Sequence, residues 1–297
     1  MRRLAFIALT IAACWFAVRE AGAAEIHAPQ NAVAGQDMSI TTGGSGSGTL
    51  YLIGPGQVIK RDIKLGGQVE IKGDELRSAG RWIAVVRGGG NPQSQVFFVQ
   101  PGKAENLNFL ARPSRVPVDK PGVITGVAFI FDKYRNLVLQ PTPVEFSLSV
   151  GEGKGATGAS QKVTSKNGVA WVRSSSARKA GAAQFVARVD ATEVKRVVQQ
   201  VASDPCNLRM HVAGRSKDYV TVETDPVRDC TGNPVPDGTI VTFIQTDSTG
   251  RSVVDARIKK GIARAELPAS DNANISVAAG VVLGNELHLG GAAGGGK

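Results

Sequence analysis

Few residues in this sequence have the types and spacing that catalysis or metal binding requires. The three histidines, His27, His211 and His288, lie far apart, and none is at metal-ligand spacing from a cysteine or another histidine. Ser176 and Lys179 fit an S-x-x-K pattern, but the K-T-G motif that accompanies it in lactamase-type enzymes is missing. The sequence therefore predicts no catalytic residue, no metal site and no cofactor.

The first 23 residues have the order of a secretory signal peptide. Arg2 and Arg3 precede an uncharged apolar run, 4–18, and Ala21-Gly22-Ala23 fits an A-x-A cleavage site. The run is short for spanning a bilayer of about 30 Å. A second interpretation takes Ile11–Cys14 as a lipobox, which would anchor the chain to a membrane through a lipid on Cys14, and an uncleaved anchor is a third. We expect an exported protein, in the periplasm, at the cell surface or secreted.

Two cysteines remain outside this segment, Cys206 and Cys230. An exported compartment permits a disulfide. Cys206 opens the last third of the chain and Cys230 lies in a polar loop, so a bond between them would fix the first strand to the rest of its domain. The alternative is two unpaired small residues in the core.

Basic residues are distributed unevenly along the chain. Residues 24–103 contain 8 basic and 6 acidic side chains (net +2), residues 104–201 contain 14 and 7 (net +7), and residues 202–297 contain 10 and 11 (net −1). A basic surface can bind anions, although it can also serve only solubility. No nucleic-acid-binding module is recognisable, so nucleic acid is not an expected partner. The candidate anion-binding residues are Arg112, Arg115, Arg173, Arg178 and Lys179.

Trp82 and Trp171 lie in apolar strand patterns beside turns that contain glycine. We expect both side chains to fill the space between two sheets, where large aromatic residues contribute most to packing. A platform for stacking sugar rings is the alternative, and it requires that one of the two be exposed.

The elements that carry these residues are predicted to be strands. Short runs of alternating apolar and polar residues recur every eight to twelve residues, with Gly, Pro, Asn and Asp between them, and helical spacing is nearly absent. This rhythm is typical of antiparallel β-sandwiches. We expect an all-β protein of three tandem sandwich domains after a signal peptide. The predicted divisions are 1–23, 26–102, 104–201, 203–289 and a flexible Gly-rich tail, 290–297.

Two stretches of the chain match each other without a gap. "DKYRNLVLQPTPVEF" at 132–146 aligns with "DCTGNPVPDGTIVTF" at 229–243. Such a match predicts a duplicated domain, and Asp and Asn side chains in turns accept hydrogen bonds from nearby backbone N–H groups. The matched pairs are Asp132 with Asp229, Asn136 with Asn233, Val138 with Val235, Val144 with Val241, and Phe146 with Phe243.

The Asp, Asn-x-Val and V-x-F pattern, followed by a Gly-Val/Ile-Ala strand, resembles bacterial immunoglobulin-like domains of the invasin/intimin group. The match is close for "VRDCTGNPVPDGTIVTF" at 227–243, looser for the middle copy, and limited to strand rhythm in 26–100. The resemblance implies stacked Ig-like sandwiches that serve as exported spacers and adhesive modules, without catalytic residues.

From these patterns we expect a non-catalytic protein of the cell envelope that binds, adheres or assembles a surface structure. The expected partner is a protein or an anionic polysaccharide of the envelope, and a membrane only if Cys14 is lipidated. The sequence does not predict the oligomeric state. A carbohydrate-binding sandwich protein is the second interpretation, and an enzyme the third.

Overall fold

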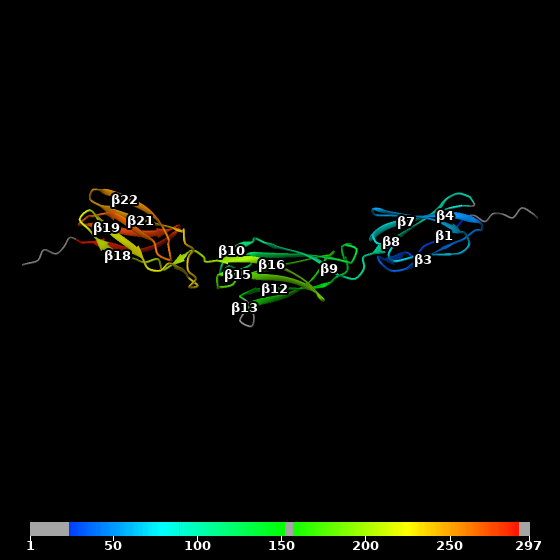
Figure 1. Ribbon diagram of the computed structural model, residues 1–297, viewed down its shortest axis with the longest axis horizontal. Helices are drawn as coiled ribbons and strands as arrows, with labels where there is room; N and C mark the ends of the chain where they lie inside the picture. Colours follow the sequence, from blue (N-terminus) through cyan, green and yellow to red (C-terminus); the bar gives the residue numbers. More distant parts are fainter. Residues whose placement is uncertain (1–23, 89, 152–156, 291–297) are drawn as a thin grey trace, which may run out of the picture. The chain divides into compact units, whose positions relative to one another are not determined.

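The computed structural model describes residues 24–88, 90–151 and 157–290. All of the described elements are β-strands, β1 to β25, so the prediction of an all-β protein is confirmed (Figure 1). Within these ranges no helix has the length and apolar character needed to cross a membrane. The predicted signal peptide, Cys14 and nearly all of the Gly-rich tail fall outside the described residues.

The first sandwich is built from residues 26–100 and contains two sheets. Its five-stranded sheet has the order β2 (Asn31–Val33), β8 (Gln93–Gln100), β7 (Gly80–Arg87), β4 (Ser47–Gly54) and β5 (Gln57–Lys64). Its three-stranded sheet has the order β1 (Ile26–His27), β3 (Met38–Thr42) and β6 (Gln68–Ile71).

The core between these two sheets contains Trp82, as the sequence predicted. The side chain is fully buried, and its ring centroid lies 6.1 Å from that of Phe97. A buried indole N–H needs an acceptor. Trp82 Nε1 donates a hydrogen bond to the Ser78 carbonyl over 2.8 Å, so the ring packs without an unsatisfied donor.

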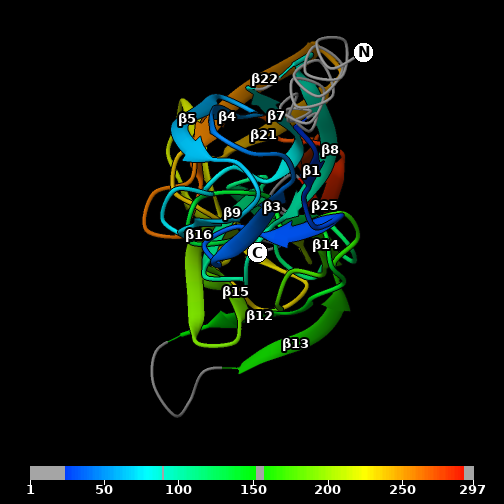
Figure 2. The same cartoon turned by 90° about the vertical axis from the view of Figure 1, so that its right-hand side faces the viewer.

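The second sandwich uses the same strand order as the first. Its five-stranded sheet runs β10 (Arg115–Pro117), β16 (Thr192–Val201), β15 (Gly181–Val189), β12 (Pro143–Val150) and β13 (Thr157–Thr164). Figure 2 shows β13 beside β12 at the edge of this sheet. The three-stranded sheet runs β14 (Val169–Ser174), β11 (Ile124–Phe131) and β9 (Asn106–Arg112).

Three phenylalanines join the two sheets of the second sandwich. Phe109 from β9 lies 5.8 Å from Phe146 of β12 and 5.1 Å from Phe185 of β15, measured between ring centroids. All three are almost fully buried, which is the arrangement that a sandwich core requires.

The larger sheet of the third sandwich has one strand fewer than the larger sheets of the other two. Its four-stranded sheet runs β22 (Gly250–Arg257), β21 (Ile240–Asp247), β24 (Ala273–Ala279) and β25 (Val282–Leu289). The facing sheet runs β18 (Met210–Arg215), β19 (Tyr219–Thr224) and β23 (Arg264–Pro268). A short ladder pairs β17 (Pro205–Cys206) with β20 (Arg228–Asp229). The core between the sheets includes Val222, Val241, Phe243 and Ile275.

The duplicated stretches occupy equivalent strands. Val144 and Phe146 lie in β12, which pairs with β13 and β15, and their counterparts lie in β21, which pairs with β22 and β24. Val144, Phe146, Val241 and Phe243 are all buried. The equivalent, buried placement predicted for the two stretches is therefore confirmed. The first sandwich shares the topology as well, including a short parallel pair, β2 with β8, that corresponds to β10 with β16.

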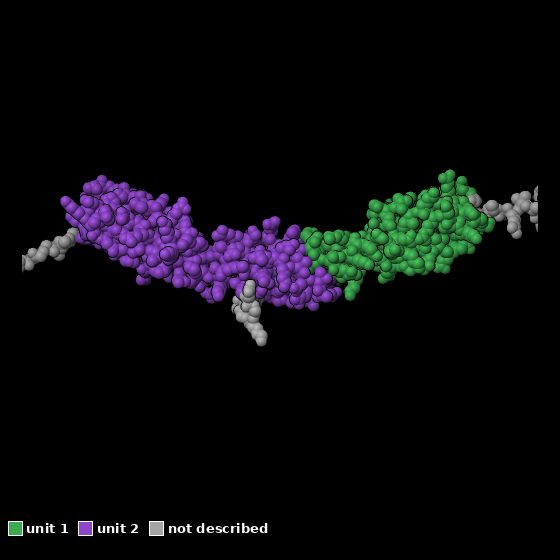
Figure 3. All heavy atoms as spheres, viewed as in Figure 1, with its two compact units in different colours: residues 1–108, 129–141, 166–168 green, residues 109–128, 142–165, 169–297 purple. Residues whose placement is uncertain are grey.

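The chain divides into two compact units (Figure 3). Unit 1 contains the first sandwich, the chain that follows it up to residue 108, and residues 129–141 and 166–168. Unit 2 contains residues 109–128, 142–165 and 169–297. The loop after β11 thus belongs to the first unit. Each unit contains one of the two sets of contacts between successive sandwiches that are described below.

Candidate functional site

The loop that follows β11, residues 132–136, is organised by one buried carboxylate. Asp132 is 1% exposed. Its Oδ1 accepts hydrogen bonds from the backbone N–H groups of Tyr134 (2.9 Å) and Asn136 (2.8 Å). Its Oδ2 accepts from the backbone N–H of Gly102 (2.9 Å) and from Asn136 Nδ2 (2.8 Å). Since Gly102 follows β8 of the first sandwich, Asp132 ties the connecting segment to this loop.

Asn136 extends from the same loop to the first sandwich. Its Nδ2 donates to the Arg77 carbonyl over 2.7 Å, and its Oδ1 accepts from the Ala79 N–H over 2.8 Å. Arg77 and Ala79 lie in the connection between β6 and β7. One carboxamide therefore bonds two backbone groups of the preceding sandwich, and all of these residues belong to unit 1.

Tyr134 adds an apolar contact at this place. Its half-buried ring packs against the core cluster of the first sandwich and covers Gly35. Gly35 has a φ of 82°, a backbone conformation that favours glycine. A Cβ atom there would also lie only 2.7 Å from Tyr134 Cε2, so both the backbone conformation and the contact with the ring disfavour a side chain. We call the contacts of Asp132, Tyr134 and Asn136 with Gly35, Arg77, Ala79 and Gly102 joint 1.

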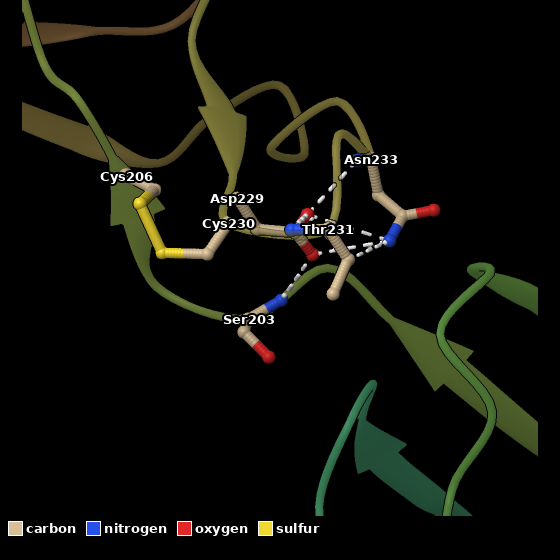
Figure 4. The surroundings of a disulfide bond; sticks show 6 residues. All are labelled: Ser203, Cys206, Asp229, Cys230, Thr231 and Asn233. Atoms are coloured by element: carbon tan, nitrogen blue, oxygen red, sulfur yellow. Dashed lines mark hydrogen bonds between the residues drawn. A yellow bond between two sulfur atoms is a disulfide. The ribbon is translucent and has the colours of Figure 1, made fainter.

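Residues 229–233 repeat the loop in the third sandwich (Figure 4). Asp229 is 4% exposed. Its Oδ1 accepts from Thr231 N (2.9 Å), Thr231 Oγ1 (2.7 Å) and Asn233 N (2.9 Å), and its Oδ2 accepts from Ser203 N (3.0 Å). Burial by itself would raise the pKa of Asp229, but the hydrogen bonds from Thr231, Asn233 and Ser203 outweigh it and lower the pKa to about 2.

Asn233 repeats the contacts of Asn136 in the same geometry. Its Nδ2 donates to the Arg178 carbonyl over 2.7 Å, and its Oδ1 accepts from the Ala180 N–H over 2.8 Å. Arg178 and Ala180 lie in the connection between β14 and β15 of the second sandwich. We call the contacts of Asp229 and Asn233 with Arg178, Ala180 and Ser203 joint 2. They all lie in unit 2.

A disulfide supports joint 2. Cys206 and Cys230 are bonded, with their Cα atoms 4.9 Å apart, within the range that a disulfide needs (Figure 4). The bond joins the end of β17 to the residue after β20, next to Asp229. The disulfide expected from the sequence is present, and it fixes the segment that enters the third sandwich to the loop that forms joint 2.

The five candidate anion-binding residues are all exposed, but they lie on different elements. Arg112 ends β9 and Arg173 lies on β14 of the three-stranded sheet, whereas Arg115 begins β10 of the five-stranded sheet. Arg178 and Lys179 line a cavity of about 450 Å³ between the loop before β15 and strands β12 and β13. Among the described residues none of the five forms an ion pair. Their role in binding anions stays a prediction.

The core position expected for Trp171 is wrong. The side chain is 61% exposed, because Ala170 and Val172 on either side of it take the two inward positions of β14. Leu110 on β9, in the same sheet, is 51% exposed and also faces outward. Trp171 and Leu110 therefore place apolar surface on the outer face of the three-stranded sheet, and Arg173 and Arg112 follow two residues after them.

The S-x-x-K pair has no geometry for nucleophilic chemistry. The Ser176 hydroxyl is nearly buried, accepts a hydrogen bond from the Lys120 N–H (2.9 Å) and donates to the Lys120 carbonyl (3.3 Å). An S-D-N triplet does occur at 270–272, but in a loop of the third sandwich. In the described part of the chain no group of three or more His, Cys, Asp or Glu side chains could hold a metal ion.

Sequence reasoning identified Asp132, Asn136, Asp229 and Asn233 as turn residues, but it missed the groups that the two asparagines bind. The sequence does contain a repeated pattern at the positions of these groups. The sequence Arg-x-Ala-Gly occurs at 77–80 and again at 178–181, each time at the start of a strand, β7 or β15.

Comparison with solved structures shows which known folds this chain resembles. The structure of FdeC, described as a broadly conserved Escherichia coli adhesin, is similar with a TM-score of 0.57 and 14% identity, covering 92% of this chain and 98% of that one. Bacterial invasin, described as an integrin-binding protein, gives a TM-score of 0.49 at 13% identity, over 88% of this chain and 57% of that one. InvD of Yersinia pseudotuberculosis also gives 0.49, at 12% identity, over 90% and 97%.

At these identities the comparison with FdeC establishes the fold, and the Ig-like resemblance expected from the sequence is confirmed at that level. No protein-family model matches the sequence. No curated protein matches it at a significant level either.

Proposed function

We propose that this chain is an exported, non-catalytic binding protein of the cell envelope, in which tandem Ig-like sandwiches carry and space an adhesive surface. The observation that carries the proposal is the tandem Ig-like fold, which is similar over 92% of the chain to a protein described as an adhesin. The disulfide is consistent with an oxidising compartment outside the cytoplasm.

Export is tested first. The full-length chain is expressed in a bacterium, the cells are fractionated, and the mature N-terminus is determined by mass spectrometry. We expect cleavage near Ala23 and recovery from the periplasm, the surface or the medium. A lipid-modified Cys14 would place the protein on a membrane instead. Recovery from the cytoplasm with an intact Met1 would refute the proposal.

The three-domain division at 26–102, 104–201 and 203–289 is part of the same proposal. It is supported by sheets that draw their strands from 26–100, 106–201 and 205–289. Limited proteolysis of the mature chain should leave protected fragments whose ends lie near residues 103 and 202. Early cuts inside the sheets would contradict the division.

A second candidate function, binding of an anionic polysaccharide, is favoured by the exposure of Trp171. An exposed indole offers a flat apolar surface on which the apolar face of a sugar ring can stack. Arg173 and Arg112 lie on strands of the same sheet, and a guanidinium can bind a carboxylate through two hydrogen bonds. Residues 104–201 carry a net charge of +7 (14 basic minus 7 acidic), which would attract such a polymer.

Binding of the mature chain to polygalacturonate, with neutral dextran for comparison, tests this second function. Substitutions Trp171→Ala and Arg173→Glu should each weaken binding at least about tenfold, and salt should weaken it further because the screening length falls to about 3 Å at 1 M. Phe98→Ala is the matched control, since Phe98 is an aromatic residue, 48% exposed, on the first sandwich. Equal binding by all variants, or an equal loss in the control, would overturn it.

A further inference from the structure

The two joints share a pattern in sequence as well as in space. Each has an Arg-x-Ala-Gly stretch in the preceding sandwich and an Asp-x-x-x-Asn loop in the following one. The first pair is 77–80 with 132–136, and the second pair is 178–181 with 229–233. The asparagine donates to the carbonyl of the Arg and accepts from the N–H of the Ala in both joints, over 2.7 and 2.8 Å.

This geometry requires a carboxamide. The Arg carbonyl and the Ala N–H are two residues apart, and one side chain must donate to the first and accept from the second. A carboxamide has an acceptor oxygen and a donor NH₂ group on one planar unit, whereas an ionised carboxylate only accepts. Asparagine therefore bonds this backbone as a neighbouring strand would.

The aspartate fixes the asparagine in position. Asp132 Oδ2 accepts from Asn136 Nδ2, and Asp229 Oδ2 accepts from Asn233 Nδ2 over 3.2 Å. Each aspartate also accepts from a backbone N–H of the connecting segment, Gly102 or Ser203. The loop thus orients its carboxamide and binds the connection at the same time.

We propose that Arg-x-Ala-Gly and Asp-x-x-x-Asn form a two-part docking device between successive Ig-like sandwiches of this chain. The loop of the following sandwich binds the backbone before β7 or β15 of the preceding one, and the asparagine carboxamide is the group that does so. The device attaches neighbouring sandwiches to each other, whatever their exposed surfaces bind. This inference goes beyond the proposed function.

The third sandwich supplies a matched control. The loop before its β24 reads Ala269-Ser270-Asp271-Asn272, without the Arg-x-Ala-Gly sequence. Asn272 is exposed, and it takes part in neither joint. Asn272→Asp therefore makes the same chemical change outside the docking device.

Amide hydrogen exchange and ¹⁵N relaxation of the intact mature chain test the proposal. In Asn233→Ala, which removes the acceptor, the Ala180 N–H should exchange at least about tenfold faster, while Ala79 is unchanged. In Asn233→Asp, which keeps an acceptor but loses the donor to the Arg178 carbonyl, sandwiches two and three should also tumble less in concert. Asn136→Ala should affect Ala79 and leave Ala180 unchanged. Asn272→Asp should affect neither.

Alanine at 136 or 233 removes both the donor and the acceptor without adding charge beside the aspartate, whereas aspartate removes the donor alone. Retained exchange rates and concerted tumbling in both the Asp and Ala variants would overturn the proposal. Loss of exchange protection throughout the third sandwich, in both variants, would also overturn it, since it would show that Asn233 stabilises its own sandwich instead of the attachment.

Discussion

Joint 1 and joint 2 use the same hydrogen bonds but different reinforcement. In joint 1 the ring of Tyr134 covers Gly35, and in joint 2 the matched position is Thr231, whose hydroxyl donates to Asp229. Joint 2 has a disulfide beside the loop and a hydrogen bond from Ser203 Oγ to the Val118 carbonyl. The hydrogen bonds of Asp and Asn are the same in both joints because only these side chains provide the required donor and acceptors. The additional stability can come from different sources, packing in joint 1 and a covalent bond in joint 2.

The largest effect on stability is expected when the disulfide of joint 2 is removed. Closing a loop across a sequence separation of 24 contributes about 3 kcal/mol by the chain-entropy estimate. Reduction, or Cys206→Ser with Cys230→Ser, should lower the free energy of unfolding of the third sandwich by that amount in denaturant titrations. The fluorescence of Trp82, buried in the first sandwich, should report an unchanged transition. A loss seen equally by Trp82 would contradict the assignment to joint 2.

The next effect concerns the charge of Asp229. Its pKa of about 2 in the folded state lies below the ordinary value of 3.8, so ionised Asp229 stabilises the fold above about pH 4. This contribution, about 2 kcal/mol, should be lost as the pH falls through 2. Asp229→Asn should therefore be less stable than the natural chain at pH 7, with a difference that shrinks on acidification.

Calorimetry of the mature chain between pH 7 and pH 2 measures this difference. Asp247→Asn is a parallel case away from joint 2, because hydrogen bonds from Thr249 also lower the pKa of Asp247 to about 2, so its difference from the natural chain should shrink on acidification as well. A difference between the Asp229 variant and the natural chain that is constant with pH would contradict the predicted role of the ionised carboxylate.

The smallest effect is expected in joint 1. Tyr134→Ala removes a half-buried ring and should reduce the stability reported by Trp82 by about 1 kcal/mol. Gly35→Ala should also destabilise, through its positive φ and the overlap with Tyr134. The two changes together should cost less than the sum of their separate effects, because the ring is then absent. Strict additivity would show that the ring does not rest on Gly35.

Strand rhythm and the duplicated motif were enough to predict the all-β fold and the burial of Val144, Phe146, Val241 and Phe243. The topology of the first sandwich was harder to predict because its loops lack the Asp-x-x-x-Asn motif, although its strands follow the order of the second. The position of Trp171 was predicted wrongly because, in a run of consecutive apolar residues, the sequence does not show which alternate residues face inward. Here Ala170 and Val172 face the core, so Trp171 faces outward.

The partners of the two asparagines could not be derived from local patterns. Asn136 and Asn233 bind backbone groups more than fifty residues earlier in the chain, and backbone groups have no residue-type signature. Only the repetition of Arg-x-Ala-Gly before β7 and β15 marks them, and its meaning depends on knowing which loops lie side by side.

The short parallel pairs have a consequence for the protein under tension. The chain enters the second sandwich through β9 and then β10, and it leaves from β16. Because β10 and β16 run parallel, a pull that reaches β10 loads their hydrogen bonds together in shear. The pair β2 and β8 is loaded in the same way. No strand of the third sandwich pairs in this manner within the described ranges. There the covalent bond between Cys206 and Cys230 closes the loop between these two residues and withholds about 80 Å of chain from extension.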